Sequence, residues 1–338
     1  MSAAAPGAGL AALFGGLSAA RNRAFDHGWL RIERLAAPVI SVGNLSVGGT
    51  GKTPAVVALG RELARRGIRY DVLTRGYRRA GGGALRVLAP NGAEADAAAG
   101  DEPRLIAQQL GVPVLVSADR VASGREGERR FASQLHLLDD GFQRRQLARC
   151  FDLVLVTPQD LQDRLLPAGR LRESPRALAR ASAVLWVAPE GGEAAQAQAR
   201  QQLARWTPAP VYFGYKQPRK PALAPATPVF AFCALGQPDS FWQTLEELQL
   251  RIVGRRSFRD HHRYRRAELA RLARDARAAA AQALATTAKD AWNLPVDHNL
   301  ERLEIIHLDL HIAGLPRLAD AMLAAAGLPH PAEGGGAG

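Results

Sequence analysis

Residues 41–54 read Ser-Val-Gly-Asn-Leu-Ser-Val-Gly-Gly-Thr-Gly-Lys-Thr-Pro and complete the apolar run 38–42. The glycines at 48, 49 and 51 let the backbone turn its N–H groups inward around phosphate oxygens. Lys52 can reach the outer phosphates and the Thr53 hydroxyl can ligate Mg²⁺, while a helix that starts near Thr53 adds its positive N-terminal end. The stretch therefore predicts a phosphate-binding loop between a strand and a helix.

The following residues support this interpretation. Residues 54–66 carry apolar side chains at helical spacing, and Gly67 is the expected end of that helix. Ser46 stands where the strict Walker A spacing places glycine, so the match to that motif is incomplete. The alternative is a flexible strand-to-helix loop that binds no ligand.

The length and composition favour a globular α/β protein of two domains. The chain has 338 residues, of which 47% are hydrophobic, enough for two packed cores. Short β-like runs alternate with helical stretches, which predicts two doubly wound α/β/α domains, the first with a phosphate-loop NTPase-like core. We expect an N-terminal helix in 1–35, a kinase-like domain in 36–215, a Pro-rich linker in 216–228, a smaller α/β domain in 229–328 and a tail in 329–338. The β-like runs are 39–42, 70–74, 112–117, 135–139, 153–156 and 184–187.

The formal charge of +12 does not by itself indicate a nucleic-acid partner. Forty arginines accompany four lysines, as a GC-rich coding bias would give, and no aromatic residues are interleaved with them to stack on bases. An anionic membrane surface or a phosphorylated lipid explains the charge equally well. We therefore expect no nucleic acid and no obligate protein partner. Cys150 and Cys233 are too few for a disulfide framework, which favours a reducing compartment.

The N-terminal segment carries an apolar stripe. Leu10, Leu13, Phe14 and Leu17 recur at helical spacing, and arginines follow. Such a helix can lie in the membrane interface with its apolar face down. The alternative is a helix that packs on the protein's own core.

Acidic residues occur at two further places that can carry chemistry. Asp139 and Asp140 follow an apolar run, at the end of a strand where α/β folds place their sites, and one of them can hold the water shell of Mg²⁺. The alternative there is an Asp-Gly turn. Asp101 and Glu102 precede a helical run, where Asp101 alone would serve as a helix cap. The sequence Asp260-His261-His262 fits proton transfer better than a metal centre.

An ordered set of motifs resembles the tetraacyldisaccharide 4′-kinase family, the lipid A 4′-kinases, from about residue 38 to residue 290. The loop variant with Asn44 and Pro54 is specific to that family, and the family tolerates a residue other than glycine at position 46. Arg144, Cys150, Arg170 and Ala288 depart from its usual pattern. The motifs are GNLSVGGTGKTP at 43–54, TRGYRR at 74–79, GDEP at 100–103, DDGFQ at 139–143, LLPAGRLRE at 165–173, GQPDSF at 236–241, DHH at 260–262 and TAKD at 287–290.

The resemblance implies transfer of the ATP γ-phosphate to the 4′-hydroxyl of a lipid A disaccharide 1-phosphate, with Mg²⁺, at the cytoplasmic face of the bacterial inner membrane. The protein would be peripheral there or held by a single N-terminal anchor among anionic lipids. By position, Asp101 and His261 would form a base dyad and Lys52 would stabilise the transferring phosphoryl group. ATP would be bound by Asn44, Gly48, Gly49, Thr50, Gly51, Lys52, Thr53 and Pro54. Mg²⁺ would be handled by Thr53, Glu102, Asp139 and Asp140, and the sugar and its phosphate would lie near Tyr77, Gln143, Arg172 and Glu173.

Two other classes of protein share some of these features. A phosphate-loop GTPase or metallochaperone switch needs a guanine-reading Asn/Thr-Lys-x-Asp motif, whereas in Thr287-x-Lys289-Asp290 the aspartate comes one position early. A non-enzymatic, membrane-bound nucleotide sensor would use the loop and the N-terminal helix but would need neither Asp101 nor His261.

Overall fold

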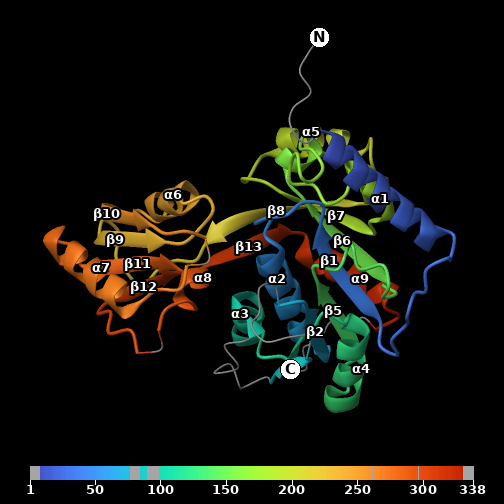
Figure 1. Cartoon of the computed structure of the whole chain (residues 1–338), viewed down its shortest axis with the longest axis horizontal. Coiled ribbons are helices and arrows are strands. Elements are labelled where there is room, and N and C mark those ends of the chain that lie inside the picture. The colour runs from blue at the N-terminus through green and yellow to red at the C-terminus, as the bar shows by residue number, and fades with distance from the viewer. Residues whose placement is uncertain (1–7, 77–83, 90–98, 261, 296, 330–338) are drawn as a thin grey trace, which may run out of the picture. The chain divides into compact units, whose positions relative to one another are not determined.

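The chain divides into two units, and each has its own sheet, largely parallel in the first and parallel in the second. The computed structural model describes residues 8–76, 84–89, 99–260, 262–295 and 297–329 (Figure 1). Unit 1 comprises residues 1–216 and 310–338, and unit 2 comprises residues 217–309. The predicted boundary at 229–328 is therefore wrong at its C-terminal end, because residues 310–328 return to unit 1. Most of the predicted linker 216–228 belongs to unit 2.

Unit 1 is built on a nine-stranded sheet with the order β13-β8-β7-β6-β1-β5-β2-β4-β3. Strand β3 pairs antiparallel with β4, while the pairs that join β4 through to β8 are parallel. The six β-like runs of the sequence all occur as strands. The strands are β1 (Val39–Asn44), β2 (Tyr70–Thr74), β3 (Arg86–Leu88), β4 (Val114–Val116), β5 (Leu135–Asp139), β6 (Phe151–Val156), β7 (Ala183–Val187), β8 (Val211–Pro218) and β13 (Leu308–Ala313).

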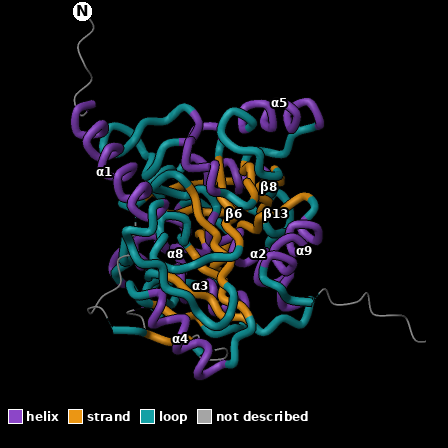
Figure 2. The backbone as a smooth tube through the Cα atoms, turned by 90° about the vertical axis from the view of Figure 1, so that its right-hand side faces the viewer, coloured by secondary structure: helices purple, strands orange, loops and turns teal. Residues whose placement is uncertain are grey.

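Helices cover both faces of this sheet, as the doubly wound prediction requires. One face carries the largest core cluster, in which Ile40 and Val42 meet side chains of α2, α3 and α9. Helices α2 and α9 lie side by side (Figure 2). The opposite face packs against α4 and α5. The helices are α2 (Lys52–Arg65), α3 (Asp101–Leu110), α4 (Arg120–Phe131), α5 (Glu193–Leu203) and α9 (Leu315–Ala325), with 3₁₀ turns at Pro158–Leu161 and Pro175–Arg180.

Local sequence explains the β1–α2 junction that holds the glycine-rich loop. All six residues of β1 are buried, which is typical of a central parallel strand. Helix α2 buries the apolar stripe predicted from the sequence and starts one residue earlier than expected, at Lys52. Gly67 has φ 72°, and its amide and that of Ile68 donate to the last turn of the helix, so the predicted end is confirmed.

The N-terminal helix α1 (Ala8–Asp26) combines a docked face with an exposed apolar face. Phe25 is buried, whereas Leu10, Leu13 and Leu17 are 63%, 61% and 64% exposed. A side chain at Gly15 would clash with Leu165, so the helix backbone lies close against unit 1 there. No helix among the described residues is long and apolar enough to cross a membrane.

Unit 2 holds a four-stranded parallel sheet with the order β10-β9-β11-β12. Helix α6 packs on one face through Phe241 and Trp242, and α7 packs on the other through Leu269 and Leu272. This arrangement confirms the doubly wound prediction for the second unit. Its elements are β9 (Pro228–Cys233), α6 (Asp239–Glu247), β10 (Arg251–Ser257), α7 (Arg266–Ala278), β11 (Ala283–Thr287), α8 (Ala288–Ala291) and β12 (Leu303–Ile306).

Candidate active site

Asn44, the last residue of β1, ties the glycine-rich loop together. Its Nδ2 donates to the Ser46 carbonyl and to Thr50 Oγ1, both at 2.8 Å, and its Oδ1 accepts from Lys52 Nζ at 3.0 Å. The loop closes at Gly51, whose φ of 94° is the left-handed conformation that glycine adopts without strain. Because the first N–H groups of α2 have no partner within the helix, this loop ends in a ready anion-binding site.

Asp139 lies at the end of β5, next to β1, and is buried to 4% exposure. Thr74 Oγ1, at the end of β2, donates to its Oδ2 at 2.8 Å. Burial, followed by the negative charges of Glu102 and Asp140, raises the pKa of Asp139 to about 7, against the Thr74 hydrogen bond and the charge of Lys52, which lower it. The charges of Glu102 and Asp140 thus act on a carboxyl that is buried from water, a condition that a divalent cation relieves.

The neighbouring Asp140 has the opposite electrostatic environment. It adopts φ 54°, and its carboxylate lies 2.8 Å from Arg172 and 3.6 Å from Lys52 Nζ. Burial would raise the pKa of Asp140, but Lys52 and Arg172 outweigh it and lower the pKa. Two adjacent carboxyls therefore differ in proton affinity. Asp140 stays ionised between two cations, and Asp139 titrates near neutrality.

The segment after these acids packs directly on the glycine-rich loop. Gln143 Nε2 donates to the Asn44 carbonyl at 3.0 Å, and its Oε1 accepts from Arg172 at 3.5 Å. Gly43 permits this approach, because a Cβ there would lie 2.5 Å from the Cβ of the fully buried Phe142. Of the predicted substrate residues, Gln143 and Arg172 thus lie beside the loop.

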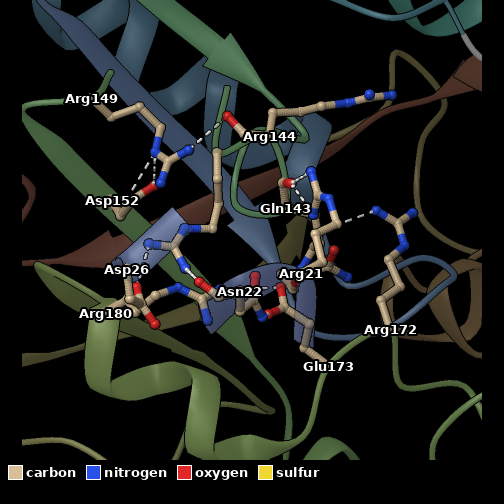
Figure 3. Close-up of polar contacts among 12 residues, drawn as sticks. Arg21, Asn22, Asp26, Gln143, Arg144, Arg149, Asp152, Arg172, Glu173 and Arg180 are labelled. Atoms are coloured by element: carbon tan, nitrogen blue, oxygen red, sulfur yellow. Dashed lines mark hydrogen bonds and ion pairs between the residues drawn. The ribbon is translucent and has the colours of Figure 1, made fainter. Parts of the chain in front are cut away.

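Glu173, the third of these residues, links the site to α1 (Figure 3). Asn22 Nδ2 donates to Glu173 Oε2 at 2.6 Å, and the Arg180 guanidinium donates to both carboxylate oxygens at 3.1 and 2.9 Å. Arg21, the residue before Asn22, donates to the Gln143 carbonyl at 3.2 Å. The polar face of the N-terminal helix is therefore part of the wall of the site.

Asp101 and Glu102 form the first turn of α3. The predicted N-cap role of Asp101 is wrong, because Gly100 occupies the cap position with φ 93° and Asp101 is already helical. Asp101 is half-buried and Glu102 is exposed, although the charge of Glu102 still raises the pKa of Asp139. Tyr77 and His261, the remaining predicted site residues, lie outside the described residues.

In unit 2, both neighbours of position 261 make polar side-chain contacts within that unit. Asp260 accepts from Lys289 Nζ at 2.9 Å, and His262 Nε2 lies 2.9 Å from Glu268. The TAKD motif ends in Asp290, a buried residue whose carboxylate accepts from Tyr264, the Ala234 amide and Thr287. This motif therefore stabilises the end of β11 and the turn after β10 in unit 2.

The donor set suits Mg²⁺ bound together with a ligand. No group of three or more metal-ligating side chains that could hold a metal ion occurs within the described ranges. Mg²⁺ usually keeps several waters and takes one or two carboxylates plus substrate phosphates. The crowded carboxylates near the loop, with the raised pKa of Asp139, fit that mode of binding.

Three residues at the site were not predicted from the sequence. Thr74 was noted only as part of a motif, and Asn22 and Arg180 were not singled out at all. The signal for Asn22 was its place among arginines on the polar side of an apolar helix, which indicated a solvated or lipid-facing surface equally well. The partners of Asn22 and Thr74 are 151 and 65 residues away in the chain, so no local pattern could reveal these two contacts.

The fold and the site define an α/β protein in which an anion-binding loop meets a pair of carboxylates at the ends of parallel strands. The chain belongs to the family whose model is described as LpxK: Tetraacyldisaccharide-1-P 4'-kinase, which matches residues 5–326. The members of this family are kinases, and the GTPase-switch interpretation is accordingly set aside.

Individual relatives agree with the family assignment. The chain is 40% identical to the tetraacyldisaccharide 4′-kinase of Koribacter versatilis, over 93% of this chain and 95% of that protein. It is 38% identical to the corresponding protein of Anaeromyxobacter dehalogenans strain 2CP-C, over 92% and 87% of the two chains. Among solved structures, LpxK from Aquifex aeolicus, described as the apo form in complex with ATP, has a TM-score of 0.76 at 28% identity and covers 94% of this chain and 97% of that chain.

Proposed function

We propose that this protein transfers the γ-phosphate of ATP to the 4′-hydroxyl of a tetraacyldisaccharide 1-phosphate, a lipid A precursor. The observation that carries the proposal is the position of Lys52. Its ammonium bridges Asn44 of the loop and Asp140, which Arg172 holds in turn. Phosphoryl transfer needs positioning and charge stabilisation more than covalent chemistry, and this chain of contacts supplies both.

Each group then has a distinct task. The loop amides and Lys52 bind the phosphates and stabilise the charge that develops on the transferring group. Thr53 and carboxylates from Asp139, Asp140 and Glu102 would hold Mg²⁺, which would supply positive charge to neutralise the phosphates. Gln143 and Arg172, beside the loop, orient the sugar.

The proton of the accepting hydroxyl requires a base. We assign that role to Asp101, assisted by His261, on the family resemblance. Asp101 supplies a carboxyl group at the first turn of α3, beside the helix N-terminus. Proton removal by such a group typically contributes about 10²–10⁴-fold to the rate.

We further propose that the protein acts at an anionic membrane surface, the cytoplasmic face of the inner membrane. The support is the exposed stripe of Leu10, Leu13 and Leu17, continued after the helix by Trp29, which is 78% exposed. The docked face of the same helix contacts Gln143 and Glu173, so a bilayer that received the stripe would lie close to the site.

The direct test is a phosphotransfer assay with radiolabelled ATP, Mg²⁺ and a tetraacyldisaccharide 1-phosphate in mixed micelles. We expect a doubly phosphorylated lipid, formed only with acceptor present, and the same disaccharide with a blocked 4′-hydroxyl as the matched control. ATP binding without transfer to the acceptor would favour the nucleotide-sensor alternative.

A further inference from the structure

Lys216, at the end of strand β8, reaches across the glycine-rich loop from the side opposite β5. Its Nζ donates to the Gly49 carbonyl at 3.2 Å, and its Cε lies 3.7 Å from the place where a Cβ on Gly51 would be. The side chain therefore spans the loop from Gly51 to Gly49. Lys216 lies outside the motifs that the chain shares with the kinase family.

The contact fixes one peptide group of the loop at both ends. This peptide group joins Gly49 to Thr50. Its carbonyl, that of Gly49, accepts from Lys216, and its N–H, that of Thr50, donates to the Gly48 carbonyl at 3.0 Å. Glycine-rich backbone is the most costly to order, because it has the most conformations to lose. A cation on the outer carbonyl thus holds the loop in one of its possible shapes.

The amino-acid usage of the chain makes a lysine at this position informative. Only four of the 44 Lys and Arg residues are lysines, at positions 52, 216, 220 and 289. Two of these four touch the loop, although arginine supplies positive charge almost everywhere else. A compact ammonium can approach a single carbonyl in a narrow space, whereas the planar guanidinium fork suits paired oxygens.

Stability of the fold is a poor explanation for this contact. Lys216 as a whole residue is exposed, although burial of its ammonium lowers the pKa of the group. A single hydrogen bond of this kind contributes little to folding, while ordering a long side chain costs entropy. A positive charge beside an anion-binding loop, by contrast, strengthens the local field that attracts phosphate.

We infer that Lys216 is a positioning residue of the nucleotide site, which holds the loop in its binding shape and adds a second lysine charge beside the phosphates. This inference rests on the proposed use of ATP. It concerns binding of the polyphosphate and not the chemical step, so it predicts a selective effect on nucleotide affinity.

The experiment compares Lys216→Met, Lys216→Arg and, as the matched control, Lys220→Met, whose lysine lies four residues further along in unit 2. Calorimetry with ADP and Mg²⁺, without lipid, reports binding alone. We expect Lys216→Met to weaken ADP binding about tenfold, Lys216→Arg to fall between it and wild type, and Lys220→Met to stay within about twofold. In the lipid assay, Lys216→Met should raise KM for ATP similarly and leave kcat within about threefold.

An ADP affinity of Lys216→Met within about twofold of wild type would overturn the inference. An equal loss in Lys220→Met would also overturn it, because the effect would then be one of net charge. ADP binding needs no acceptor, so a protein that binds ADP in a Lys216-dependent manner but transfers nothing to the lipid would reject the proposed function and leave this inference standing.

Discussion

The side chains of Asn22 and Glu173 share a 2.6 Å hydrogen bond that joins the N-terminal helix to the residue beside Arg172. Since Arg180 also pairs with Glu173 and Arg172 with Asp140, one short series of polar contacts leads from α1 to the phosphate loop. The helix that presents apolar side chains to the outside is therefore fixed to the site through its other face.

Breaking this bond should affect the lipid substrate more than ATP. We expect Asn22→Ala to raise KM for the lipid roughly five- to tenfold, because α1 would no longer be held against the wall of the site, with little change in ADP affinity. Steady-state kinetics with each substrate varied in turn measures both effects. Arg23→Ala on the same helix is the control, and equal changes for both substrates would contradict the expectation.

The exposed stripe of α1 should determine membrane binding. Replacing Leu10, Leu13 and Leu17 together by Asp removes apolar surface and adds negative charge, so sedimentation with anionic vesicles should fall at least about tenfold. ADP binding should stay unchanged because the docked face of the helix remains intact. Deleting residues 1–20 should act in the same direction. Equal sedimentation of the triple variant and wild type would show that the stripe has no such role.

Lys52→Ala should nearly abolish turnover. The variant loses the charge that meets the transferring phosphoryl oxygens and leaves Asp140 with Arg172 as its remaining cation partner, so we expect kcat to fall by about 10³-fold or more. Initial rates at saturating ATP test this, and circular dichroism checks that the variant is folded. Turnover like that of wild type would reject the kinase mechanism proposed above.

Asp139 and Asp140 should make the free energy of unfolding depend on pH. In the folded protein the pKa of Asp139 is raised to about 7 from 3.8, so between these values the folded state holds a proton that the unfolded state has lost. Stability therefore decreases as pH rises through this window. Asp139→Asn has no carboxyl to ionise, so its stability does not decrease in this way. It should become more stable than wild type towards pH 8, by a few kcal/mol at most, since each pKa unit is worth about 1.4 kcal/mol.

Thermal unfolding in EDTA without nucleotide, from pH 4 to 8, checks this expectation. Asp140→Asn is the control of opposite sign, because the lowered pKa of Asp140 stabilises the folded state above the unfolded value. Parallel curves for wild type and Asp139→Asn would contradict the assignment. Added Mg²⁺ and ADP should stabilise wild type more than Asp139→Asn.

The proposed base dyad predicts a non-additive pair of substitutions. Asp101→Ala and His261→Ala should each lower kcat by roughly 10²–10⁴-fold with little effect on ATP affinity. Because residues that act as a unit lose their function together, the double variant should be scarcely slower than either single one. Fully multiplicative losses would show that the two residues act separately.

Local sequence was enough to locate the loop, its flanking strand and helix, and the acids after β5. The reason is that glycine spacing, burial of β1 and the Asp-Gly step are properties of short segments. The same patterns could not show that β13 joins the first sheet, because the sequence of a strand does not specify which other strand it pairs with. Nor could they decide between Asp101 and Gly100 as the cap, since both residue types are common there.

The path of the chain through β8 and β13 has a consequence for how the protein can be built. These strands are neighbours in one sheet, and Arg219, the residue after β8, pairs with Asp309 of β13 and donates its amide to the His307 carbonyl. In sequence, the second unit is therefore an insertion between two paired strands, β8 and β13, and it has its own sheet and two cores. We therefore expect each unit to fold when expressed separately, with a short turn joining β8 to β13 in the first.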